Sequence, residues 1–355
     1  MTSRQSSAAR GPAESMRAVV VRDGRAAVER VAAPPPADDG VHSGIRGGTH
    51  AGPQAEVLVR PLLALLTPLD REVVRGLGAT GSEPRIAGTA AVAVVERSPA
   101  GHALRRGDRV VVQPVLSCGA CERCRSGLSI HCAGRRLVGI DAPGALAERL
   151  ALPATACLPI PDGLDDAHAV FAAPLARAVE AVRRGGVARR SFASVLGDDL
   201  LAVLATLVAV EENPLARLVS SSEATLRIAE QLGIRHRLAA ETGRRGDQEL
   251  VIDTTGSSAS IEAATRMVRP RGHVVVAGLG ARGGVAVDLS HLALDEIEVH
   301  GSGFGPFAGA LGMLAQGAID PTPLVSRRCG LDDAPRALGQ VGDDGVLSVL
   351  VQVDR

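Results

Sequence analysis

Lysine, tryptophan and tyrosine are absent from the 355-residue sequence, and Asn213 is its only asparagine. All 39 basic residues are therefore arginines, and they balance 39 acidic residues. Without lysine the chain can form no Schiff base, no phosphate-binding loop of the GxxxxGK[ST] type and no protein-kinase active site. Without tyrosine it has no tyrosyl general acid. The abundance of Ala, Gly, Val, Arg and Leu is typical of GC-rich codon usage, and we attribute the missing lysine to that bias.

The small number of aromatic residues and the net charge of zero argue against nucleic acid as a binding partner. Four phenylalanines offer almost no stacking surface for bases, and a neutral chain lacks the basic footprint of a nucleic-acid-binding protein. No apolar run reaches the roughly 18 residues of a membrane span. The first residues contain no hydrophobic segment typical of a secretory signal. We therefore expect a cytoplasmic protein that binds neither nucleic acid nor membrane, and its length favours two domains.

The first half of the chain has the pattern of a β-rich domain. Residues 1–15 are polar and small, which predicts a disordered leader. Two strands are expected at 16–34 around the Asp23-Gly24 turn, and further strands at 56–64, 87–98 and 107–115. Between them, residues 36–54 are rich in Pro and Gly and predict a long surface loop. We expect this domain to span residues 16–155.

The second half alternates strands with helices. Apolar strands are predicted at 192–197, 216–221, 249–255 and 273–279, separated by helical segments such as 223–233. This alternation predicts an α/β domain with a doubly wound parallel sheet, expected over residues 156–297. Residues 298–355 contain two more helical segments and a final strand, and we expect them to return to the first domain.

Four of the six cysteines are closely spaced. Cys118, Cys121, Cys124 and Cys132 have the spacing C-x2-C-x2-C-x7-C. Four thiolates can close a tetrahedral shell around zinc with no position left for water, which predicts a structural metal site. The alternative, four reduced cysteines without metal, is disfavoured because such close spacing seldom arises without a ligand. Cys157 and Cys329 are isolated, and we interpret them as packing residues.

This arrangement resembles the zinc-type alcohol dehydrogenases of the medium-chain dehydrogenase/reductase superfamily, which join a GroES-like domain to a Rossmann-type domain. The resemblance covers about residues 16–355. Besides the cysteine loop, it rests on the segments 59–76, 84–96, 171–182 and 251–257.

The resemblance implies where a catalytic zinc would bind, and at these positions the sequence differs from the family pattern. A ligand cysteine is replaced by Thr67, and the Gly-His-Glu triplet with the second ligand reads Gly88, Thr89, Ala90. The segment usually read E-P-L-A-C has Ala173 in place of the glutamate and Arg177 in place of the cysteine. Asp70, which in the family orients the metal shell from behind, remains. Since catalytic zinc needs three protein donors of N, S or carboxylate type, we predict that it does not bind.

The sequence also differs from the cofactor-binding motif that the resemblance implies. The family turn G-x-G-x-x-G corresponds to Gly197, Asp198, Asp199, Leu200, Leu201 and Ala202. Asp199 places a carboxylate where the pyrophosphate would meet the helix N-terminus, although an Asp there is also a good N-cap. After the second strand stand Ser220, Ser221 and Ser222, which favour NADPH over NADH if a dinucleotide binds. A serine-rich surface turn is the alternative.

Two hypotheses follow. In the first, the chain is a redox-neutral enzyme or a non-catalytic partner subunit, with a structural zinc and candidate cleft residues Thr67, Asp70, Thr89 and Arg177. Arg177 would hold an anionic group of a small-molecule substrate, unless it forms a structural ion pair with Asp70. In the second, it is a zinc-independent, NADPH-dependent reductase of an activated carbonyl. The resemblance also implies a homodimer, or a heterodimer with a paralogue, formed through a sheet edge near residues 297–303.

Overall fold

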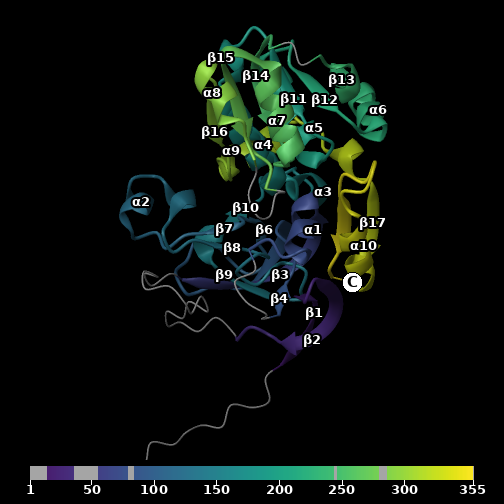
Figure 1. The fold of residues 1–355 in the computed structure, drawn as a ribbon. Helices are drawn as coiled ribbons and strands as arrows, with labels where there is room; N and C mark the ends of the chain where they lie inside the picture. Colours follow the sequence, from purple (N-terminus) through teal and green to yellow (C-terminus); the bar gives the residue numbers. More distant parts are fainter. Residues whose placement is uncertain (1–13, 36–54, 79–83, 244–245, 280–285, 355) are drawn as a thin grey trace, which may run out of the picture.

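The computed structural model describes residues 14–35, 55–78, 84–243, 246–279 and 286–354. Figure 1 shows two lobes, with the parallel-sheet domain above and the β-rich domain below. The loop at 36–54 and residues 1–13 of the leader predicted over 1–15 lie outside the described residues, whereas Ser15 already belongs to the first strand. Within the described part of the chain, no helix is both long and apolar enough to cross a bilayer.

The β-rich domain begins with a hairpin. Strands β1 (Ser15–Arg22) and β2 (Arg25–Ala32) pair antiparallel, as the sequence predicts. Asp23 and Gly24 connect them with φ angles of 50° and 74°. Both angles lie in the left-handed region that a two-residue hairpin turn of type I′ requires, which explains the Asp-Gly pair.

A larger mixed sheet forms the body of this domain. Its strand order is β10-β6-β5-β3-β18-β17, and β9 pairs with β3 beside this path. These strands are β3 (Glu56–Leu66), β5 (Ala91–Arg97), β6 (Arg109–Val112), β9 (Leu150–Pro153), β10 (Cys157–Pro159), β17 (Arg327–Gly330) and β18 (Val349–Gln352). The smaller strands are β4 (Arg85–Ile86), which pairs with β1, and the pair β7 (Val115–Leu116) and β8 (Arg136–Leu137). The C-terminal chain thus returns to the first domain through β17 and β18.

The second sheet is parallel throughout and has the order β13-β12-β11-β14-β15-β16. Its strands are β11 (Ala193–Leu196), β12 (Arg217–Ser220), β13 (His236–Leu238), β14 (Gln248–Asp253), β15 (Val268–Val276) and β16 (Glu298–Gly301). The order reverses between β11 and β14, the switch point typical of a doubly wound fold. The predicted fold class is therefore confirmed. The four predicted strands are present, whereas β13 and β16 are short, polar edge strands that periodicity does not reveal.

The helices of the described residues are α1 (Pro68–Val74), α2 (Glu122–Arg125), α3 (Asp166–Ala169), α4 (Ala172–Gly185), α5 (Leu200–Glu212), α6 (Glu223–Gln231), α7 (Ser258–Met267), α8 (Leu289–Leu294), α9 (Phe307–Ala315) and α10 (Ala334–Gln340). Of these, α1, α2 and α10 lie with the β-rich domain, and helices of the second domain cover both faces of the parallel sheet. Helices α4 and α5 share a core with Val275 of β15, whereas α7 packs on the opposite face with Val274.

The strands divide the domains differently from the expected boundaries at 155 and 297. Strand β10 still pairs with β6 of the first sheet, and β16 is the last strand of the second. Helix α9 packs against α4, so the return to the first domain starts after α9. The physical reason is that a boundary follows strand pairing, which a change in composition does not mark.

One hydrophobic core spans both sheets. Leu63 and Leu65 of β3 belong to the same buried cluster as Phe171, Leu175 of α4 and Leu250 of β14. All five side chains are buried. The domains therefore share a continuous apolar interior.

Candidate functional site

The four clustered cysteines meet in the loop that projects from the first domain around α2 (Figure 1). The Sγ–Sγ distances are 3.5 Å for Cys118–Cys132, 3.5 Å for Cys121–Cys124, 3.8 Å for Cys121–Cys132 and 3.9 Å for Cys118–Cys124. A tetrahedron with Zn–S bonds of ~2.3 Å has edges of about 3.8 Å. The sulfur positions therefore fit a zinc ion.

Backbone amides favour the thiolate form of Cys118 and Cys121, whereas burial raises the pKa of Cys124 to about 12. The amide N of Cys121 lies 3.3 Å from Cys118 Sγ, and that of Cys118 lies 3.4 Å from Cys132 Sγ. Hydrogen bonding from the Cys124 backbone is the largest influence that lowers the pKa of Cys121, to about 6. Because thiolates are the ligands that zinc binds, these amides prepare the loop for the metal.

The predicted cleft residues of the first domain form a closed hydrogen-bond network around Asp70. Thr67 is the N-cap of α1, and its backbone N and Oγ1 both donate to Asp70 Oδ2 at 2.9 Å. The backbone N of Thr89 donates to Asp70 Oδ1, also at 2.9 Å. Asp70 is almost fully buried, and burial raises the pKa of its carboxyl group despite these donors. The structure thus joins Thr67, Asp70 and Thr89 at one point, where the carboxylate binds the threonines.

Arg177 lies on α4 and faces this network from the second domain. Its Nη2 donates to the carbonyl O of Ala277 at 2.9 Å, at the carboxyl end of β15. Burial lowers the pKa of Arg177, whereas the charges of Asp199 and Asp70 raise it. Among the described residues Arg177 forms no ion pair with either carboxylate, so the alternative interpretation of Arg177 as an ion-pair partner of Asp70 is not supported. Arg177 is therefore influenced by the charges of two carboxylates without forming an ion pair with either.

Asp199 occupies the N-terminus of α5, as predicted for an N-cap. Its Oδ1 accepts from the backbone N of Ala202 at 2.9 Å, and the Thr254 hydroxyl lies 3.1 Å from the same oxygen. Burial raises the pKa of Asp199, and the charge of Arg177 opposes this. Gly197 leads into this turn, and a Cβ there would lie 2.0 Å from Thr254 Oγ1. In dinucleotide sites the backbone N–H groups at this helix N-terminus bind the pyrophosphate. Here the carboxylate of Asp199 accepts from one of them instead.

The serine cluster is engaged by the neighbouring Asp198. Asp198 Oδ1 lies 2.6 Å from Ser220 Oγ and accepts from the backbone N of Ser221 at 2.6 Å. The Ser221 hydroxyl donates to Asp198 Oδ2, and Ser222 caps α6 by accepting from the backbone N of Thr225 at 3.0 Å. The sequence did not reveal this role of Asp198, because Asp198 meets the serines only through the pairing of β11 with β12.

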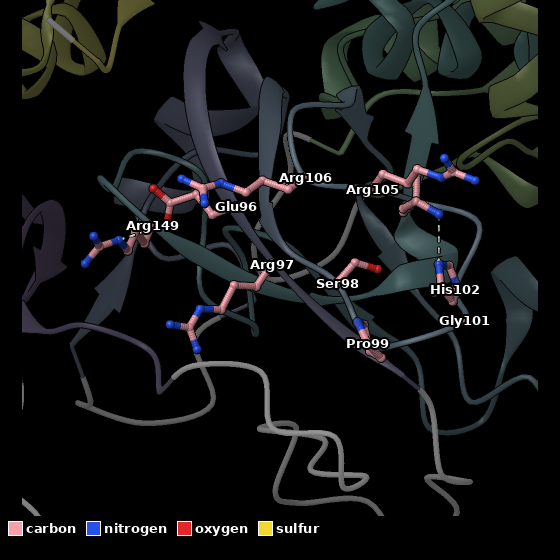
Figure 2. A pocket seen from close by; sticks show the side chains of 10 residues that line it. Glu96, Arg97, Ser98, Pro99, Gly101, His102, Arg105, Arg106 and Arg149 are labelled. Atoms are coloured by element: carbon pink, nitrogen blue, oxygen red, sulfur yellow. Dashed lines mark hydrogen bonds and ion pairs between the residues drawn. The ribbon is translucent and has the colours of Figure 1, made fainter.

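A basic hollow in the first domain lies apart from these residues. Its volume is about 1010 Å³, and Figure 2 shows around it Arg97, at the end of β5, and Arg105 and Arg106, on the β5–β6 connection. Arg149 at its rim pairs with Glu96, with an Nε–Oε2 distance of 3.0 Å. None of the predicted site residues lines this hollow. It adds no group to the candidate site.

Comparisons with known proteins agree with this architecture. Residues 53–162 match the family model "Alcohol dehydrogenase GroES-like domain", and residues 202–316 match "Zinc-binding dehydrogenase". An uncharacterized zinc-type alcohol dehydrogenase-like protein of Haemophilus influenzae is 26% identical over 284 residues, which are 76% of this chain and 82% of that protein. The 2-dehydro-3-deoxy-L-galactonate 5-dehydrogenase of Pseudoalteromonas atlantica is 26% identical over 69% of this chain and 76% of its own.

Among solved structures, a putative zinc-binding dehydrogenase from Sinorhizobium meliloti bound to NADP superposes with a TM-score of 0.82 at 25% identity. The match covers 96% of this chain and 99% of the other. Both sheets, the cysteine loop and these matches define an oxidoreductase fold of the alcohol dehydrogenase type. The chain belongs to the medium-chain dehydrogenase/reductase superfamily.

Proposed function

We propose that this chain is a zinc-stabilised member of the superfamily that does not oxidise alcohols and instead binds a carboxylate-bearing small molecule between its domains. One observation carries the proposal. The chain's own aspartates 198 and 199 hold the donors that a dinucleotide would need, namely the N-terminus of α5 and the serines after β12. A bound dinucleotide would have to displace both carboxylates.

The absence of catalytic zinc is part of this proposal. Thr67, Thr89 and Ala173 stand at the expected ligand positions and offer no N, S or carboxylate donor. The two threonines instead bind Asp70. The cysteine loop holds the structural zinc in this proposal, because its four sulfur atoms leave no open position for a substrate.

Arg177 suggests the class of ligand. Among the described residues its guanidinium has one hydrogen bond, to Ala277, which leaves donors for a bidentate carboxylate. One relative is a dehydrogenase of 2-dehydro-3-deoxy-L-galactonate, a sugar acid. We therefore propose a sugar acid or a similar hydroxy acid as substrate of a redox-neutral reaction, or as the ligand of a non-catalytic subunit.

Metal analysis combined with cofactor titration tests the proposal. After dialysis against a weak chelator, we expect one zinc per chain and no tight binding of NADH or NADPH. A panel of sugar acids should raise the melting temperature of the wild type but not of Arg177→Met. The control Arg184→Met, about two turns further along the same helix, should behave as the wild type does. Tight dinucleotide binding, or a second zinc lost on substitution of Asp70, would overturn the proposal.

The second candidate is a zinc-independent, NADPH-dependent carbonyl reductase. The NADP-bound relative and the serines after β12 favour it. Hydride transfer needs only positioning and a polarising donor, which Thr67 or Thr89 would provide. Consumption of NADPH with enones, aldehydes and keto sugars supports this candidate. Absence of turnover together with absence of cofactor binding removes it.

We also propose a cytoplasmic homodimer formed through the edge of the parallel sheet. Strand β16 ends the sheet, and exposed apolar side chains lie on it and on the preceding α8. Leu289, Leu294 and Val299 are 73%, 83% and 46% exposed. Burial of such side chains is the usual driving force for association. A heterodimer with a paralogue would use the same edge.

A further inference from the structure

Two histidines and a glutamate come together on the last two strands of the parallel sheet. In the β15–β16 register, His273 lies opposite Glu298, and His300 lies opposite Val275. Because side chains alternate between the faces of a strand, all three project from the face that carries Val275. Helix α4 covers this face, and Arg184 of that helix donates to the carbonyl O of Gly301 at 3.3 Å.

The three side chains already have the spacing of metal ligands. Glu298 Oε2 lies 3.4 Å from His273 Nδ1 and 3.2 Å from His300 Nε2. A tetrahedral ion with bonds of ~2.0–2.1 Å has ligand–ligand edges of about 3.3 Å. A ligand atom from each residue lies within 4.8 Å of the others, and the two imidazole rings are stacked with an angle of 16° between their planes. Both imidazole nitrogens thus approach the same oxygen of Glu298.

The surroundings allow a cation to enter. The Glu298 side chain is 60% exposed and that of His300 33%, whereas His273 is 18% exposed at the inner end. Burial, followed by the charge of Arg190, lowers the pKa of His273. Arg269, which also faces His273, lies 3.2 Å from Glu249 Oε1, so part of its charge is compensated.

We propose that His273, Glu298 and His300 form a second metal site, distinct from the cysteine loop, for a divalent transition cation such as zinc. Two imidazoles and one carboxylate leave at least one position for water or another ligand. The ion links β15 to the edge strand β16. Since the ligands project from strands, the site is held by backbone pairing.

Zinc titration of the full-length protein, with its cysteine loop loaded, tests the proposal. Calorimetry should show a further equivalent of Zn²⁺ in the wild type. We expect His300→Ala and Glu298→Gln each to weaken this binding at least tenfold. His236→Ala, on the strand at the opposite edge of the same sheet, should bind as the wild type does. All three substitutions are at partly or fully exposed positions, and equal melting temperatures without added zinc would show that the fold is intact.

The outcome also locates the ion. Long-range nitrogen–proton NMR of the imidazoles should show zinc-induced shifts at Nδ1 of His273 and Nε2 of His300. No further equivalent of zinc, or a further equivalent unaffected by both ligand substitutions, would overturn the proposal. The two proposals can fail separately, because a zinc between the domains would persist in His300→Ala and be lost on substitution of Asp70, whereas a zinc on His273, Glu298 and His300 would behave in the opposite way.

Discussion

Replacing Asp199 by glycine should create dinucleotide affinity. The substitution restores the glycine of the pyrophosphate turn and removes the carboxylate that caps α5. Two unit charges ~6 Å apart repel by about 3 kcal/mol at an effective dielectric constant of ~20. That energy corresponds to about a hundredfold change in the dissociation constant. Because glycine is itself acceptable at an N-cap, the cost to stability should be only a few tenths of a kcal/mol.

The same reasoning predicts a dependence on pH. The pKa of Asp199 is raised by burial, so its carboxylate takes up a proton more readily than an ordinary aspartate. As the pH falls through this pKa, the negative charge is lost and the repulsion with it. Residual NADPH binding by the wild type should therefore strengthen at lower pH, whereas the advantage of Asp199→Gly should shrink. The second carboxylate, Asp198, remains on the serines, so Asp198→Ala combined with Asp199→Gly should bind most tightly.

Calorimetric titration with NADPH measures these effects. The fluorescence of NADPH provides a second assay, because a chain without tryptophan adds little emission of its own. Asp288→Gly is a matched control, since Asp288 caps α8 by accepting from the backbone N of Ser290 and of His291. It should lose a cap without gaining cofactor. Unchanged NADPH affinity in a folded Asp199→Gly and in the double variant would refute the view that these carboxylates exclude the dinucleotide.

Three further predictions concern the metal, the buried network and the sheet edge. Cys132→Ser should retain no zinc in the cysteine loop after dialysis and should melt at a lower temperature, as measured by metal analysis and circular dichroism. Asp70→Asn should lose about 1–3 kcal/mol in urea unfolding, because an amide cannot accept all the bonds that the carboxylate does, whereas Asp108→Asn should change little. Leu294→Arg should yield monomers in light scattering, while Leu128→Arg, at another exposed leucine, should not.

Features encoded by adjacent residues were predictable from the sequence. The Asp23-Gly24 turn fixes the β1–β2 hairpin through two left-handed residues. The spacing of the cysteines from Cys118 to Cys132 brings four sulfur atoms together within a single loop. In both cases the information lies within fifteen residues, so no knowledge of the tertiary fold is needed.

Contacts that depend on strand pairing were not predictable in this way. The position of Asp198 on the serines after β12 requires β11 and β12 to be neighbours. Likewise, His273 meets Glu298 only through the β15–β16 register, and a shift of one residue would turn the glutamate to the other face. Arg177 reaches Ala277 because α4 covers the same sheet. Hydrophobic periodicity along the sequence does not show which strands pair or in which register.

The core shared by Leu63, Leu65, Phe171, Leu175 and Leu250 has a consequence for unfolding. Separate domains with a wet interface can melt one after the other, but here loss of either sheet would expose the apolar side chains of the other to water. The chain should therefore unfold in one cooperative transition. A fragment cut between the two sheets would carry an uncovered leucine-rich face, so neither half is suited to independent expression or to exchange between proteins as a module.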